Sequence, residues 1–303
     1  MPEELTTRIA SWLTETGHPF EMLATRSVAS ALAGTEWRVI SNIFHEDLET
    51  NKPREVDIEL HWISALEEVE SRLPLSVELQ VLIECKTAAE PWIILRHGPD
   101  ESRPWTSRAR PLLDVSYLSG AVNWSQYQAG TSMDPLLSSL SDHLESHLPA
   151  HQSPGYAIMD AFKDRKSSYD AVRQAVASCI NAAATVHLSY SVPAVSWYFP
   201  VVLTSARLFE ASLADASDDL DIREVERTSV LASLPGATDC VVTIVRPPAL
   251  VSLTDDVKDI EHVVEDFLSR SSPDMVRVAA NEPFLISSSP PHIAERRKAI
   301  NAI

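Results

Sequence analysis

The chain has 303 residues, of which 45% are hydrophobic and 22% charged, so it can fold around one large core or two modest ones. Its formal net charge of −18 argues against a protein that coats nucleic acid non-specifically. No apolar run approaches the ~20 residues of a membrane span, and the acidic, amphipathic first segment is unlike a signal or transit peptide. Three cysteines without metal-ligand spacing indicate a reducing cytoplasm as the expected location.

Two helices are expected at the start of the chain. Residues 3–16 repeat their hydrophobic positions at helical spacing, and the Gly-His-Pro sequence that begins at Gly17 ends this helix. A second helix is expected to begin at Pro19 and to end at Gly34. Glu21 lies in its first turn, where an acidic residue complements the helix dipole. On this pattern alone, Glu21 has a structural explanation.

Three strands follow, over residues 37–44, 54–62 and 77–86. Residues 63–76 are compatible either with a helix or with a long hairpin. In the second strand, hydrophobic residues alternate with polar ones, which predicts one face with Val56, Ile58, Leu60 and Trp62 and an opposite face with Glu55, Asp57, Glu59 and His61. In the third strand the same rule predicts one face with Val77, Leu79, Val81, Ile83 and Cys85 and the other with Glu78, Gln80, Leu82, Glu84 and Lys86.

Two carboxylates and one amine are therefore expected together at the edge of this sheet. Glu84 and Lys86 point the same way, and antiparallel pairing of the two strands brings Asp57 to them. Two neighbouring carboxylates repel one another unless a cation lies between them, and Mg²⁺ is the usual cation. A lysine beside such an ion can orient a water molecule or stabilise charge on a phosphate.

The pattern weakens from residue 87 to about residue 153, where a helix over 134–147 is the one element expected. The clearest helix of the chain spans residues 167–187, and a strongly apolar strand follows over 194–204. A strand, a crossover helix and a second buried strand predict a parallel pair of strands.

The last third of the chain is expected to add strands to the same sheet and to end in helices. The strands are expected over residues 207–213, 222–231 and 239–245, and the helices over 253–270 and 294–303. Phosphate-binding glycine loops, a nucleophilic serine elbow and an H-E-x-x-H motif do not occur in the sequence. His143 and His147 are four residues apart but lack a third ligand, so we expect no zinc site there.

Asp57 followed, after an interval, by Glu84-Cys85-Lys86 resembles the motif of the PD-(D/E)xK nuclease superfamily. The string G-H-P-F-E-M-L-A-T, the later R-E-V-D-I and the Pro-Trp after E-C-K are similar to one bacterial subgroup, and these agreements span residues 17–95. The predicted order of helix, three strands, helix and strand is also that of the nuclease core.

The resemblance implies an α/β fold with a restriction-endonuclease-like core, in which helices flank a mixed central sheet in the order α-β-β-β-α-β. The chain would form a single domain with its core at about 17–95 and 165–205, a long insertion at about 96–160 after the third strand, and a C-terminal α/β extension over about 206–303.

The resemblance further implies a nuclease that uses Mg²⁺ or Mn²⁺ to hydrolyse phosphodiester bonds, with DNA as the expected substrate and a role in defence or DNA processing. Asp57, Glu84, Glu21 and the backbone carbonyl of Cys85 would hold the metal, and Lys86 would position the attacking water. Two alternatives stay open: a nuclease-fold binding or scaffold subunit with little activity, and an unrelated α/β protein. A protein partner or a homo-oligomer is also open, whereas a membrane is not expected.

Overall fold

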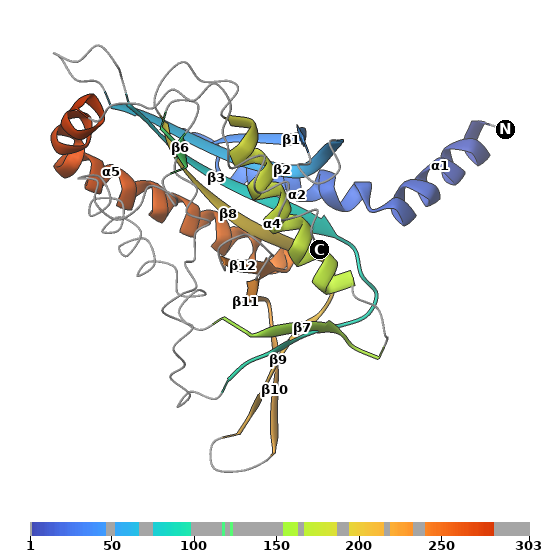
Figure 1. Ribbon diagram of the computed structural model, residues 1–303. Coiled ribbons are helices and arrows are strands. Elements are labelled where there is room, and N and C mark those ends of the chain that lie inside the picture. The colour runs from blue at the N-terminus through green and yellow to red at the C-terminus, as the bar shows by residue number, and fades with distance from the viewer. Residues whose placement is uncertain are drawn as a thin grey trace.

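The computed structural model shows a mixed α/β protein in which helices flank a mixed sheet (Figure 1). The residues that it describes are 2–46, 52–66, 75–97, 117–118, 122–123, 154–162, 167–186, 194–214, 219–232 and 240–281. The helices expected over 134–147 and 294–303 lie outside the described residues.

The two N-terminal helices form as predicted. Helix α1 spans Pro2–Thr16 and α2 spans His18–Ala31, and Gly17 between them has a φ of 84°, a left-handed conformation that favours glycine. Helix α1 projects away from the rest of the molecule (Figure 1). Its apolar stripe is therefore exposed to solvent. The side chains of Leu5, Ile9 and Trp12, which belong to this stripe, are 48–58% exposed.

The main sheet has six strands in the order β1-β2-β3-β8-β12-β11. Their bounds are Arg38–Glu46 for β1, Pro53–Leu66 for β2, Leu75–Lys86 for β3, Ala194–Thr204 for β8, Cys240–Val245 for β12 and Arg227–Ala232 for β11. Strands β1, β2 and β3 are antiparallel, whereas β3 and β12 both run parallel to β8. Helix α4, Ser167–Val186, precedes β8 in the chain, so the predicted parallel pairing after a crossover helix is confirmed.

The described ends of the interval between the second and third strands are extended and paired, as the hairpin alternative predicts. The ladder between β2 and β3 runs out to Leu66↔Leu75, so residues 63–66 and 75–76 are extended. Residues 67–74 lie outside the described part of the chain.

A second sheet has the order β10-β9-β4-β7. Its strands are β4 (Trp92–Leu95), β7 (Ala157–Asp160), β9 (Leu208–Leu213) and β10 (Leu220–Val225). A short separate ribbon pairs β5 (Tyr117–Leu118) with β6 (Val122–Asn123).

The prediction that the strands after β8 all extend one sheet is therefore wrong. Strands β9 and β10 belong to the second sheet, and the single strand expected over 222–231 is two strands in different sheets. The chain changes sheet at Glu226, where Arg246 fixes the corner with a backbone hydrogen bond of 2.9 Å and a side-chain hydrogen bond of 2.8 Å. Strand β10 is largely exposed and β11 largely buried, which fits their separation.

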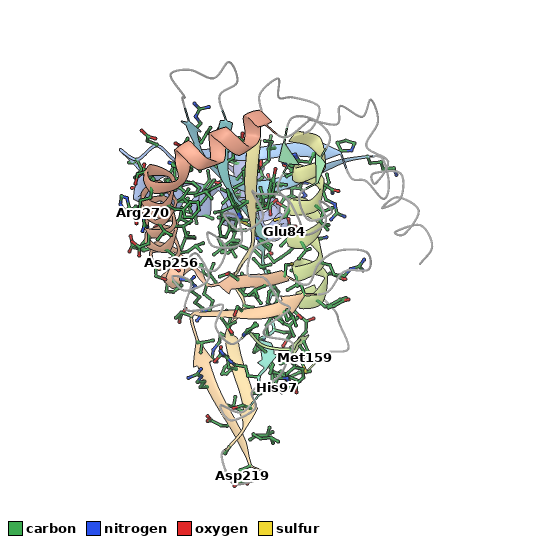
Figure 2. All side chains as sticks on the ribbon, turned by 60° about the vertical axis from the view of Figure 1, so that its left-hand side comes forward. Glu84, His97, Met159, Asp219, Asp256 and Arg270 are labelled. Atoms are coloured by element: carbon green, nitrogen blue, oxygen red, sulfur yellow. The ribbon has the colours of Figure 1, made fainter. Side chains whose placement is uncertain are left out.

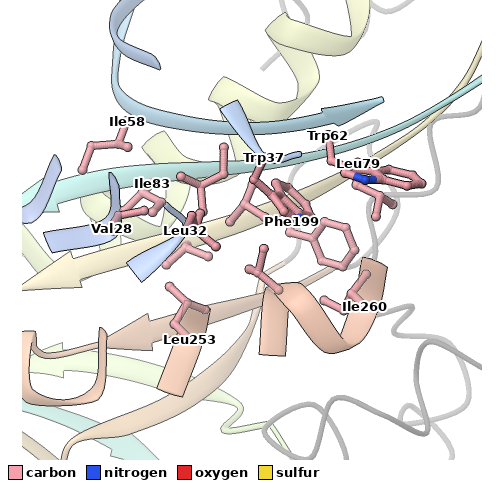
Figure 3. Close-up of a cluster of buried hydrophobic side chains, with 14 of the residues drawn as sticks. Val28, Leu32, Trp37, Ile58, Trp62, Leu79, Ile83, Phe199, Leu253 and Ile260 are labelled. Carbon is pink, nitrogen blue, oxygen red and sulfur yellow. The ribbon is translucent and has the colours of Figure 1, made fainter. Parts of the chain in front are cut away.

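Each face of the main sheet carries its own hydrophobic cluster. The first cluster lies between the sheet and helices α2 and α5 (Leu250–Asn281), and Figure 3 shows its side chains from both layers. A 3-10 turn at Pro247–Ala249 separates α5 from β12. The second cluster lies under α4 and extends to the smaller sheet through Trp92 and Ile94. None of the helices in the described ranges is both long enough and apolar enough to cross a membrane.

The polar face of β3 is covered, and one residue of the predicted apolar face of β2 is misplaced. The polar face of β3 is not open to solvent: Glu78 is 0% exposed and Gln80 is 2% exposed, because α4 packs against that face. In β2, Val56 does not share a cluster with Ile58. Val56 packs in the second cluster and Ile58 in the first, so the strand rotates at Asp57, the residue between them.

Candidate active site

Strands β2 and β3 stop pairing with one another at the residues that the motif contains. Their antiparallel ladder ends at the pair Ile58↔Ile83. Beyond this pair, β2 remains paired with β1, and β3 remains paired with β8. We call the place where the two strands part the fork. Asp57 and Glu84 are the first residues beyond the ladder, so both lie at the fork, and Glu84 lies inside the wide part of the molecule (Figure 2).

The Asp57 side chain takes the place of a ladder partner for β3. Its Oδ2 accepts a hydrogen bond of 2.6 Å from the backbone N–H of Cys85. In an extended strand the N–H and C=O of one residue point to the same side, so the Cys85 carbonyl also faces the fork. The carbonyl of Lys86 points to the opposite side, where it accepts a hydrogen bond of 3.0 Å from the backbone N–H of Ser205. The Cys85 carbonyl therefore lies on the side expected of a ligand at the fork.

Glu84 and Lys86 lie together at the end of β3, as the period of two predicts. The Lys86 Nζ is 2.7 Å from Glu84 Oε1. The Lys86 side chain is 33% exposed and that of Glu84 is 10% exposed, so the lysine reaches from solvent into the fork. This ion pair leaves the ammonium group accessible to an incoming ligand.

Helix α2 brings Glu21 to the same place. The start of the helix lies against the end of β3, where a Cβ on Gly17 would be 3.4 Å from Thr87 Oγ1. Glu21 is in the first turn, and its Oε2 lies 3.1 Å from His18 Nδ1. Its negative charge acts on Asp57. All of the residues that the sequence singles out are thus within electrostatic reach of Asp57.

The charges at the fork favour a protonated Asp57. Burial, the Glu84 carboxylate and the Glu21 carboxylate raise the pKa of Asp57 from 3.8 to about 7, against the opposing effects of the Cys85 N–H hydrogen bond and the Lys86 ammonium group. Burial and the carboxylate of Asp57 also raise the pKa of the Cys85 thiol, so this cysteine is a packing residue and not a nucleophile.

The donor chemistry of the fork fits a hard divalent cation. The oxygen donors of three carboxylates and one backbone carbonyl are the type that Mg²⁺ and Mn²⁺ prefer, and burial and the carboxylates of Glu84 and Glu21 together raise the pKa of Asp57. As the side chains stand, however, no three His, Cys, Asp or Glu residues within the described ranges are arranged to hold a metal ion. Binding an ion would require the carboxylates to rotate toward one another.

Sequence reasoning missed a second polar cluster on the α4 side of β2 and β3. His45, Glu59, His61 and Glu78, which we call the buried His–Glu array, make successive contacts of 3.5–3.7 Å. The sequence contained one signal for it: Leu82 interrupts the polar row of β3, and a large apolar side chain there indicates that this face is covered.

Comparisons with protein-family models, with curated proteins and with solved structures found no match to this chain.

Proposed function

We propose that this protein is a metal-dependent nuclease that hydrolyses phosphodiester bonds, with DNA as its expected substrate. The observation that carries the proposal is the fork, where Asp57, Glu84, Lys86 and Glu21 meet from three different elements and act electrostatically on one another. Structural carboxylates are usually paired with cations or exposed, whereas here Lys86 pairs with Glu84, and burial together with the Glu84 and Glu21 carboxylates raises the pKa of Asp57 to about 7.

The arrangement of the elements supports the same proposal. A helix, three antiparallel strands, a second helix and a strand parallel to the third come in this order in the chain, with strands β4 to β7 between the third strand and the second helix. This is the order expected of a restriction-endonuclease-like core, and the fork lies at the motif positions of that core. The long insertion and the C-terminal part beyond β8 are additions to it.

The strongly negative net charge of the chain argues less strongly against binding of nucleic acid once the positions of the acidic residues are known. The acidic segment over residues 210–226 includes most of the paired strands β9 and β10, and Asp219, just before β10, is far from Glu84 (Figure 2). Several of its carboxylates are paired with arginines, and these pairs are Glu210 with Arg96 and Arg223, Glu224 with Arg207, and Glu226 with Arg246. Nucleic acid could therefore approach the fork without meeting this acidic segment.

The residues of the fork have separate roles in the proposed reaction. Asp57, Glu84, Glu21 and the Cys85 carbonyl would hold the ion, which when bound supplies positive charge to offset charge that develops on the phosphate. Lys86 exchanges its contact with Glu84 for one with the attacking water or the phosphate, and orients the water for in-line attack.

The experiment is cleavage of linear DNA, circular DNA and RNA in Mg²⁺ or Mn²⁺ by the native chain and by Lys86→Ala. The matched control is Lys258→Ala, which removes a lysine of similar exposure that also pairs with a carboxylate, far along the chain in α5. We expect metal-dependent cutting that the Lys86 variant loses and the Lys258 variant keeps. Cutting that survives in Lys86→Ala would contradict the assigned site, and absence of cutting by the native chain on every substrate would contradict the nuclease itself.

A second candidate function is binding, as a subunit of a larger assembly. The observation that favours it is the exposed apolar stripe of α1, with Leu5, Ile9 and Trp12 about half exposed. Sedimentation of the native chain and of Trp12→Glu tests it. A native assembly that the variant dissolves would support binding, and identical monomeric behaviour of both proteins would contradict self-association through this helix.

A further inference from the structure

The buried His–Glu array lies in a largely buried part of the sheet, where the His61 side chain is 12% exposed. His45 is 8% exposed, Glu59 3% and Glu78 0%. His45 Nε2 is 3.5 Å from Glu59 Oε2, His61 Nδ1 is 3.7 Å from Glu59 Oε1, and His61 Nε2 is 3.5 Å from Glu78 Oε2. Removing one member of such a buried polar chain takes from its neighbour the nearest polar group, which is costly.

The central strands anchor one end of the array. Glu78 on β3 accepts hydrogen bonds of 3.3 Å from Gln80 and 3.4 Å from Ser196 on β8. The other end is His45, near the end of β1. The array therefore connects the middle of the main sheet to the outermost part of the ribbon formed by β1 and β2.

This ribbon is bent at Asp57. The register passes from Ser41↔Ile58 to Ile43↔Val56, which places Asn42 opposite Asp57. Asn42 has a φ of 55°, in the left-handed region that strands do not use.

The hydrophobic residues on either side of the bend belong to different clusters. Val39 and Ile58 pack with the first cluster, whereas Ile43 and Val56 pack with the second. In a straight ribbon, residues two or four apart in one strand share a face. Both strands therefore change face between these positions, at Asn42 and Asp57.

The contact between His45 and Glu59 is possible only because of this bend. His45 pairs with Arg54, which precedes Glu59 by five residues in the same strand. A straight strand would separate them by about 16 Å along its axis. The two side chains together reach roughly 10 Å from their Cα atoms at standard bond lengths. A contact of 3.5 Å therefore joins the two arms of the bend.

We propose that His45 and Glu59 are positioning residues, which hold the bend of the β1–β2 ribbon and thereby set the place of the Asp57 carboxylate at the fork. Asp57 lies at the vertex of the bend, so the angle between the arms decides where its side chain points. Through this link the array sets the position of the Asp57 carboxylate relative to the Glu84 carboxylate. The catalytic consequence rests on the proposed nuclease function, whereas the position of Asp57 can be measured without it.

The test uses protein labelled with ¹⁵N at cysteine only, because the chain has three cysteines and the Cys85 amide donates to Asp57. The Asp57→Ala variant defines the amide signal without that hydrogen bond. His45→Gln and Glu59→Gln each keep a side chain of similar size but remove the imidazole or the carboxylate that makes the 3.5 Å contact across the bend. Ser196→Ala is the matched control, because it disturbs the same array at the end that does not cross the bend.

We expect the Cys85 signal in His45→Gln and in Glu59→Gln to move at least halfway toward its position in Asp57→Ala, and to stay in place in Ser196→Ala. The Cys240 signal is the internal reference for a folded core, since Cys240 is buried in the second cluster. If His45→Gln does not fold, the isosteric Glu59→Gln variant carries the test. A Cys85 signal that stays in place in the folded variants would overturn the proposal.

Turnover separates this proposal from the nuclease proposal. If the native chain cleaves nucleic acid, we expect His45→Gln to lower kcat tenfold or more while KM stays within twofold. A rise in KM at unchanged kcat would overturn the positioning role. If the Cys85 signal moves as expected but the native chain cleaves nothing, positioning of Asp57 stands and the nuclease function fails.

Discussion

Replacing Asp57 by asparagine should stabilise the protein at alkaline pH in the absence of metal. Burial and the nearby carboxylates raise the pKa of Asp57 from 3.8 to about 7 in the folded chain. Between these two values the folded state binds more protons than the unfolded state, so the stability that Asp57 contributes falls as the pH rises from about 4 to about 7. Asparagine keeps the shape of the side chain and an oxygen to accept the Cys85 hydrogen bond, but carries no charge.

The size of the effect follows from the rise in pKa. A rise from 3.8 to about 7 corresponds to about 4 kcal/mol in the free energy of unfolding, which is an upper limit. Because the carboxylate is only partly buried, we expect the Asp57→Asn variant to be more stable than the native chain by roughly 2 kcal/mol at pH 8 and by nothing measurable near pH 4. Urea denaturation in the presence of a chelator, at both pH values, measures the difference.

Addition of Mg²⁺ should reverse the order of stability. An ion held by Asp57 stabilises the native chain and not the variant. At pH 7 its binding should release about half a proton from Asp57, since a group with a pKa of about 7 is half protonated there. Calorimetry of Mg²⁺ binding in buffers of different ionisation enthalpy measures the number of protons released.

The control for this experiment is Asp221→Asn, which alters an exposed carboxylate on β10 and should change stability by no more than about 0.5 kcal/mol at either pH. An Asp57→Asn variant that is less stable than the native chain at pH 8 without metal would refute the electrostatic reasoning. Equal Mg²⁺ affinity in both proteins would show that Asp57 is not a ligand.

Three further substitutions test other parts of the structure. Lys86→Ala should abolish cleavage while changing the free energy of unfolding by about 1 kcal/mol or less, because its ion pair is partly exposed; a variant that unfolds would contradict this. Trp37→Phe removes the donor of a 2.6 Å hydrogen bond to the buried Glu261 and should cost about 1–3 kcal/mol in urea denaturation. Burial raises the pKa of Glu261, and the hydrogen bond from Trp37 opposes this rise by stabilising the ionised carboxylate. The loss of stability in Trp37→Phe should therefore be larger at pH 7 than at pH 4. A loss that does not depend on pH would contradict this account of the hydrogen bond. Glu210→Gln should lower the free energy of unfolding by roughly 3 kcal/mol at pH 7. Burial raises the pKa of Glu210, but hydrogen bonds from Thr228 and two arginines outweigh burial and lower it. The difference between native chain and variant should therefore shrink as acid protonates the native carboxylate.

The elements that the sequence predicts well are those whose signal is local. The apolar run over 194–204 coincides with β8, because a strand buried on both faces is uniformly apolar and is bounded by polar residues. Helix α4 is predicted to within one residue by its apolar spacing. The parallel pairing of β3 with β8 then follows from chain connectivity. Glu84 and Lys86 are brought together by the period of two in a strand.

The errors arise where a distant part of the chain decides the outcome. Glu78 and Gln80 have the composition of a solvated face, but α4 covers them, and alternation in β3 cannot report what packs on top. The change of face at Val56 depends on a left-handed residue, Asn42, in the neighbouring strand. The division of residues 222–231 between two sheets depends on a contact with Arg246, which lies beyond the segment itself.

The cost of Asp57 to stability bears on the choice between a nuclease and a scaffold. A sheet that parts between two strands leaves backbone groups without ladder partners, and a neutral asparagine at position 57 could accept the Cys85 hydrogen bond without repelling Glu84 or Glu21. Stability alone therefore gives no reason for a carboxylate there, whereas an ion that binds at the fork does. A scaffold would gain from the substitution at every Mg²⁺ concentration. A nuclease would gain only without the ion, so the sign of the stability difference in saturating Mg²⁺ separates the two functions even before a substrate is found.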